Sequence, residues 1–74
     1  MPVMSVFSMR FHWKAGEPEP PRAGPFALEA REQAGALKEA DQRWQMQPYR
    51  QQPKGYRVFQ NDGGGLIYRY EPRP

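Results

Sequence analysis

A small α+β domain, with β-α-β-β order and a three-stranded antiparallel sheet packed against one helix, is the fold that this sequence predicts. Three observations lead to it. An alternating apolar and polar run precedes residue 15, an apolar stripe with helical spacing follows residue 25, and two alternating runs flank a glycine-rich turn near the C-terminus. With 74 residues the chain has the length of a single domain over 1–74, near the lower limit for a self-sufficient core.

The first element expected is a strand over residues 3–14. Its apolar side chains alternate with polar ones: Phe7, Met9, Phe11 and Trp13 against Ser8, Arg10, His12 and Lys14. Successive side chains of a strand point to opposite faces, so this period of two predicts a half-buried strand. Residues 15–25 contain four prolines and two glycines and are expected to form a mobile loop, because proline has no backbone donor.

A helix is expected over residues 26–44, since Pro25 suits the first helical position and Gly24 suits the cap before it. The apolar residues of this segment have helical spacing: Phe26, Ala30, Ala34, Leu37, Ala40 and Trp44. The small alanines allow the helix to lie close to the sheet, and Trp44 is expected to close the core. Gly35 lowers the helix propensity by about 1 kcal/mol relative to alanine, so this helix depends on packing.

A polar connection over residues 45–55, which contains two prolines, is expected to lead to a β-hairpin over residues 56–71. Asn61–Gly65 supplies the turn residues between its two alternating runs. A three-residue loop pairs Tyr56 with Tyr70, Val58 with Tyr68, Gln60 with Leu66, Phe59 with Ile67 and Arg57 with Arg69. This register leaves open which face of the hairpin is buried; if it is the face that carries the tyrosines, the core receives Tyr56, Val58, Leu66, Tyr68 and Tyr70.

The candidate site is the sheet face that points away from the helix. It is expected to be a basic surface with an apolar centre, made of Arg10, His12, Lys14, Arg57, Phe59, Ile67 and Arg69. Such a face can dock the acidic surface of a protein, or bind single-stranded nucleic acid by stacking bases and pairing phosphates. A plain solvated strand face is the third interpretation of the same alternation.

No catalytic or metal-binding signature is visible, so we expect no enzyme activity, no metal and no cofactor. The chain has one His and no Cys, which leaves neither a metal site nor a nucleophilic triad. Glu17 and Glu19 lie in the Pro-rich loop, which cannot hold the fixed separation that acid and base catalysis requires. Gly63–Gly65 lacks the following Lys-Ser or Lys-Thr and helix of a phosphate-binding loop.

The net charge is +3, a weak preference for anionic partners. Met1–Met9 has no basic start ahead of an unbroken apolar run, so we expect neither a signal peptide nor a membrane span here, and Met4 is as suitable a start as Met1. The absence of cysteine fits a reducing compartment. We therefore expect a cytoplasmic protein that does not contact a membrane.

These features favour a non-enzymatic binding module that engages a protein partner through its basic sheet face or its hairpin edge. In size and element order the chain is similar to small bacterial and phage-encoded proteins that act by occupying a surface of a larger machine, some inhibitors of host defence among them. Three alternatives remain: a single-stranded nucleic-acid binder, a homodimer formed through the edge strand 66–71, and a structural subunit without independent function.

Overall fold

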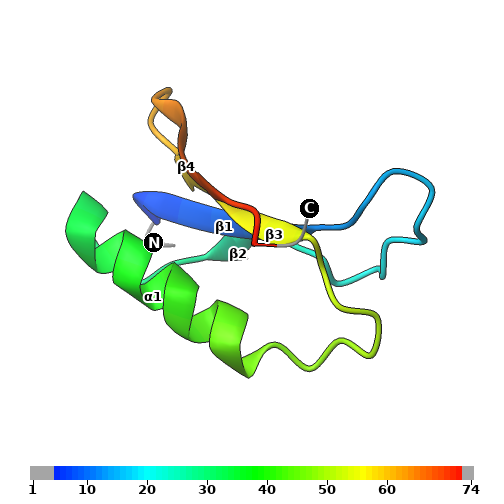
Figure 1. The fold of residues 1–74 in the computed structure, drawn as a ribbon. Helices are drawn as coiled ribbons and strands as arrows, with labels where there is room; N and C mark the ends of the chain where they lie inside the picture. The colour runs from blue at the N-terminus through cyan, green and yellow to red at the C-terminus, as the bar shows by residue number, and fades with distance from the viewer. Residues whose placement is uncertain (1–4, 73–74) are drawn as a thin grey trace.

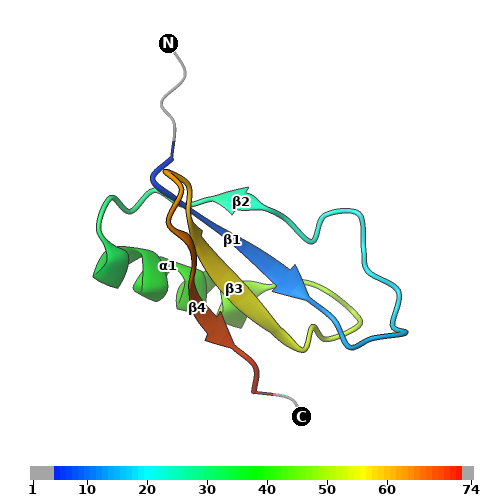
Figure 2. The ribbon, with the colours of Figure 1, turned by 90° about the horizontal axis from the view of Figure 1, so that it is seen from above.

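Four antiparallel strands and one helix form the fold in the computed structural model, which describes residues 5–72 (Figure 1). The strands follow the order β2-β1-β3-β4 across the sheet, and the helix packs on one face (Figure 2). In chain order the elements are β1 (Phe7–His12), β2 (Phe26–Ala27), α1 (Gln33–Met46), β3 (Gly55–Gln60) and β4 (Gly65–Tyr70). The class is the predicted α+β class, but the sheet has four strands and not three.

β1 is the N-terminal strand that the alternation predicted, and it lies inside the sheet. Phe7, Met9 and Phe11 face α1 and are at most 4% exposed. The strand is shorter than predicted: it ends at His12, before a turn that is closed by a hydrogen bond from the Glu17 N–H to the Lys14 carbonyl. Residues 3 and 4 of the predicted strand lie outside the described residues.

The prediction of a helix that starts at residue 26 is wrong, because a short strand occupies this position. In β2, Phe26 pairs with Met9 and Ala27 pairs with Ser8, and the next N–H, that of Leu28, donates to the Phe7 carbonyl over 3.0 Å. Backbone groups that bond to β1 in this way cannot start a helix. Pairing with the sheet therefore overrides the local preference of proline for a helix start.

α1 consequently begins at Gln33, after a turn that a carboxylate of the helix itself holds. The Glu39 carboxylate accepts hydrogen bonds of 2.9 to 3.0 Å from the N–H groups of Glu29 and Ala30. Of the predicted stripe, Ala40 is buried, whereas Ala34 is exposed. The helix turns Ala36, Ala40 and Trp44, each four residues apart, toward the sheet, and this shifts the apolar stripe away from Ala34.

Linked aromatic rings form the core between α1 and the sheet. The ring centroid of Phe11 lies 6.2 Å from that of Trp44 and 5.4 Å from that of Tyr49. The ring centroid of Trp44 also lies 5.8 Å from that of Tyr56 and 5.7 Å from that of Tyr70. Aromatic pairs at such distances each contribute about 0.5–1.5 kcal/mol beyond the area they bury. Trp44 thus joins the helix to three strands and closes the core, as predicted.

Both long connections lack regular structure, as predicted, and both are hydrogen-bonded to the end of β1. The Ala23 carbonyl of the Pro-rich loop accepts from the Phe11 N–H over 2.9 Å. In the connection after α1, the Gln51 carbonyl accepts from the Trp13 indole over 2.9 Å, and the Lys54 N–H donates to the His12 carbonyl over 2.8 Å. The first of these bonds holds the C-terminal end of the Pro-rich loop against the sheet, and the other two hold the connection after α1 there.

β3 and β4 form the predicted hairpin, and its register is correct in the half that lies far from the turn. Tyr56 pairs with Tyr70 and Val58 pairs with Tyr68. Tyr56 and Val58 are at most 2% exposed, as a core position requires, whereas Tyr68 is 37% exposed. The strand β4 thus covers the core only in part.

Near the turn the predicted register is wrong, because β4 contains a β-bulge. Phe59 pairs with Leu66 and Gln60 with Gly65, which leaves Ile67 as the extra residue. One extra residue moves the side chains beyond it to the other face of the sheet. Leu66, which was expected in the core, is therefore 49% exposed.

The first prediction concerns the ring that joins α1 to the sheet. Trp44 is only half-buried, so we expect Trp44→Ala to lower the free energy of unfolding by about 2–3 kcal/mol, less than the ~3–5 kcal/mol of a fully buried ring. Urea denaturation followed by circular dichroism measures this change. Met46→Ala is the control, since Met46 is in the same helix and 81% exposed, and it should change the value by less than about 0.5 kcal/mol. Equal losses in both variants would contradict the packing role.

The second prediction concerns Gly55, where β3 approaches the end of β4. A Cβ atom at Gly55 would lie 1.8 Å from the Tyr70 carbonyl oxygen, and the backbone cannot move aside without loss of strand pairing. We expect Gly55→Ala to cost about 1–3 kcal/mol of stability, measured by thermal denaturation. In the control, Gly35→Ala, the nearest atom is the Ala30 Cβ at 3.3 Å, so this neighbour has to move by only a few tenths of an ångström. A Gly55→Ala protein as stable as the control would refute the backbone clash.

Candidate functional site

The candidate site is the face of the sheet opposite to α1, which no other helix or strand of residues 5–72 covers (Figures 1 and 2). Residues on this face alternate along each strand with the core residues and are paired with one another across the strands. We call it the open face, and its side chains are Ser8, Arg10, His12, Arg57, Phe59, Leu66 and Arg69.

Three arginines form a row across the open face. Arg10 of β1 is directly opposite Arg57 of β3, which is directly opposite Arg69 of β4. Directly opposed side chains have Cβ atoms about 4.5–5.5 Å apart, and like charges in such positions repel each other. The row therefore brings three guanidinium groups side by side. The hairpin register alone predicted only the opposition of Arg57 and Arg69.

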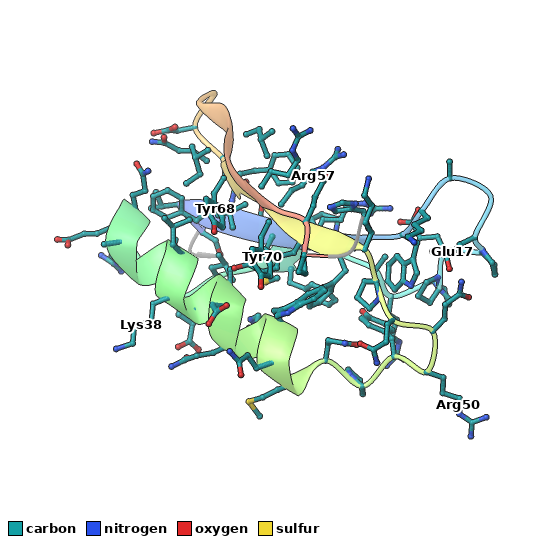
Figure 3. All side chains as sticks on the ribbon, viewed as in Figure 1. Glu17, Lys38, Arg50, Arg57, Tyr68 and Tyr70 are labelled. Atoms are coloured by element: carbon teal, nitrogen blue, oxygen red, sulfur yellow. The ribbon has the colours of Figure 1, made fainter. Side chains whose placement is uncertain are left out.

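Carboxylates compensate two of these three arginines. Glu19 reaches from the Pro-rich loop to form an ion pair with Arg10, and Glu71 lies 3.8 Å from the Nε of Arg69. Arg57 has no ion-pair partner within the described residues, and its Nε is buried without a hydrogen-bond partner. Figure 3 shows its side chain rising from the sheet on the side away from α1. The uncompensated charge thus lies at the centre of the row.

His12 lies beside this row, and its surroundings disfavour its protonated form. Burial and the nearby charge of Arg57 lower its pKa, with smaller contributions from Lys54 and Arg69, whereas Glu71 acts in the opposite direction. The side chain is 15% exposed, and its Nε2 has no hydrogen-bond partner. A histidine whose pKa is below its usual value is uncharged at pH 7.

The apolar part of the open face is a cross-strand pair, Phe59 and Leu66. Phe59 is half-buried and Leu66 is 49% exposed. Ile67, which was predicted on this face, is half-buried and packs against the core cluster. Lys14, also predicted here, lies beyond the end of β1, where its N–H donates to the Glu17 carboxylate over 3.0 Å. The other predicted site residues share the open face.

Sequence reasoning missed three residues at this site, and no periodic signal marks them. Leu66 reaches the open face only because of the β-bulge in β4. Lys54 belongs to an irregular connection, and Glu71 follows the last strand, so the fold alone brings them to 3.8 Å from each other.

A separate groove lies on the other side of the sheet, between α1, the edge at β2 and the connection after the helix. Its volume is about 830 Å³, within the range of ~300–1,000 Å³ that small-molecule sites occupy. The Tyr49 hydroxyl closes one end by donating to the Arg22 carbonyl. The lining combines aromatic and apolar side chains with charges of both signs: Phe11, Arg22, Phe26, Glu29, Lys38, Glu39, Arg43, Met46 and Tyr49. Three positive and two negative side chains are among these residues.

Comparison with known proteins assigns no family to the chain: no family model, curated protein or solved structure matches it. Within residues 5–72, no group of three or more His, Cys, Asp or Glu side chains is arranged to hold a metal ion. In the same part of the chain, no helix has the length and apolar character needed to cross a membrane.

The third prediction concerns the pH dependence of stability. Because the pKa of His12 is lower in the folded chain than its usual 6.5, the unfolded chain takes up this proton first as the pH falls. Neutral His12 should therefore contribute fully to the free energy of unfolding above pH 6.5. Below pH 6.5 the free energy of unfolding should decrease, until the pH reaches the pKa that His12 has in the folded chain. Urea denaturation between pH 7.5 and pH 5.5 measures this slope. His12→Gln should remove the slope, and an unchanged slope in that variant would show that another group causes it.

Proposed function

We propose that this chain is a non-enzymatic binding module whose open face engages a protein partner with an acidic and apolar surface. The observation that supports it most is the position of Arg57, an uncompensated guanidinium in the middle of the arginine row. Occupation of a functional surface on that partner would make the chain an accessory or inhibitor protein.

The chemistry of the open face fits a protein interface. Arginine and aromatic side chains carry much of the binding energy at such interfaces, where a few central residues dominate. Phe59 is two residues from Arg57 on the same strand face and pairs with the exposed Leu66. A partner carboxylate would satisfy Arg57 while an apolar side chain covers Phe59 and Leu66.

Single-stranded nucleic acid is supported less well on the same face. Sheets that bind single strands stack two or three bases on aromatic rings. Among the described residues, the rings on the open face are those of Phe59 and His12, and the His12 side chain is only 15% exposed. Arg10 and Arg69, the arginines at the ends of the row, are already compensated by carboxylates. A protein partner therefore agrees better with the distribution of rings and charges.

The outer edge of β4 offers a second contact surface. β4 is the terminal strand of the sheet, and edge strands present unpaired N–H and C=O groups to another chain. Tyr68 is 37% exposed in this strand and Leu66 49% exposed. A second copy that pairs here would form a homodimer, so self-association must be tested together with partner binding.

The fourth prediction uses photo-cross-linking in the native host. A photoreactive phenylalanine analogue at position 59 is expected to cross-link one protein species, and Arg57→Glu should abolish this product because it reverses the central charge. The same analogue in place of Lys38, on the outer side of α1 (Figure 3), serves as the control and should give no such product. Mass spectrometry identifies the species that is captured.

Other outcomes would refute the proposal in identifiable ways. Capture of the chain itself, together with a dimer in sedimentation equilibrium, would assign the open face to self-association. Labelled single-stranded oligonucleotides tested by fluorescence anisotropy would favour nucleic acid if binding falls steeply with salt and is lost in Arg57→Glu. Equal cross-linking from positions 59 and 38 would mean that the open face has no special role.

A further inference from the structure

The carboxylate of Glu71 lies among several nitrogen-bearing side chains at one end of the open face. Its oxygens are 3.8 Å from His12 Nε2, 3.8 Å from Lys54 Nζ and 3.8 Å from Arg69 Nε. Arg57 is opposite Arg69, and its charge acts on His12 more strongly than that of Glu71 does. We call His12, Lys54, Arg57 and Arg69 the anion seat.

Glu71 is held in the anion seat by charge and not by short hydrogen bonds. Hydrogen bonds between charged nitrogen and oxygen groups are about 2.7–2.9 Å long, clearly shorter than these three contacts. Within the described residues, two buried side-chain nitrogens have no hydrogen-bond partner, and both belong to the anion seat: His12 Nε2 and Arg57 Nε. Buried polar atoms are usually hydrogen-bonded, so the hydrogen-bonding capacity of these two nitrogens is unmet in the free chain.

The positive charge of the anion seat exceeds the negative charge of Glu71. Lys54, Arg57 and Arg69 each carry one positive charge, and His12 is neutral at pH 7. After Glu71 is counted, two positive charges remain. A phosphate monoester carries a charge of about −1.5 to −2 at pH 7 and three strong acceptor oxygens, so it matches the anion seat better than a single carboxylate does.

We propose that the anion seat binds a phosphate monoester carried by the protein partner, and that this ester displaces Glu71. The inference rests on the proposed function, because Arg57 and Arg69 belong both to the open face and to the anion seat. The two guanidinium groups and the Lys54 ammonium donate hydrogen bonds to the phosphate oxygens. Glu71 acts as an internal competitor that weakens the binding of singly charged anions.

Two small probes test the charge of the preferred ligand. Phenyl phosphate and phenyl sulfate share one ring and a tetrahedral oxyanion, but only the phosphate, with a second pKa of about 6, is a dianion at pH 7.5. His12 is the only histidine of the chain, so its ring protons give one reporter signal in proton NMR titrations. At constant ionic strength we expect phenyl phosphate to bind at least about tenfold more tightly than phenyl sulfate.

Variants of the whole chain assign the binding to the anion seat. Glu71→Gln removes the competitor and should tighten phenyl phosphate binding by about three- to tenfold, whereas Arg57→Gln should weaken it by more than about tenfold. Lys54→Gln should weaken it by a similar factor, and it keeps the test valid if Arg57→Gln does not fold. Arg50→Gln is the matched control, because Arg50 lies in a connection far from Arg57 (Figure 3), and it should leave the affinity unchanged.

Equal affinities for the two probes, or an affinity unchanged by Lys54→Gln, would overturn the inference. Inorganic phosphate distinguishes the two possible sources of the ligand, a phosphate ester on the partner and free phosphate. If inorganic phosphate binds more tightly than phenyl phosphate, the anion seat binds free phosphate and the role of the partner is overturned.

Failure of the anion seat is also distinguishable from failure of the proposed function. A cross-link from position 59 without phenyl phosphate binding rejects only the anion seat, and phenyl phosphate binding without that cross-link rejects the protein partner.

Discussion

The packing of Trp44 against rings from three strands is the interaction on which the rest of this structure depends. The helix that carries it has no side-chain hydrogen bond at its N-cap and contains Gly35, so its own backbone stabilises it weakly. Short helices of this kind are marginal in water unless a tertiary contact holds them. Ala36 and Ala40 contribute by their small size, since they allow the helix to come close enough for the ring contacts.

A core on one side of the sheet has a direct consequence for the other side. Every second residue of β1, β3 and β4 must point away from the core, and the register places arginines opposite each other there. Repulsion in this row is reduced by carboxylates from outside the strands, Glu19 from the Pro-rich loop and Glu71 from the end of β4. The loops of this small fold therefore contribute to the electrostatics of the open face as much as the strands do.

The charge of Arg57 has no ion-pair partner among the described residues, and the ion pairs of Glu71 are long, at 3.8 Å. Both features stabilise the free chain little and leave these groups able to bind a ligand. An arginine nitrogen that is buried without a partner costs free energy in the free chain, and a ligand that satisfies it recovers this cost on binding. Glu71 follows the last strand, so its displacement does not require the core to change. The groove on the helix side shares β1 with the open face, but none of its lining residues belongs to the open face or to the anion seat.

The class of fold, the core side of β1 and the hairpin could be predicted from the sequence, because alternation and turn chemistry are local properties. Three other features depend on tertiary contacts. A two-residue strand, β2, displaced the start of the helix, since pairing with β1 outweighs the local preference of Pro25. The bulge at Ile67 moved Leu66 to the open face, and folding brought Lys54 and Glu71 together. Such contacts depend on backbone pairing between distant segments, which no local pattern encodes.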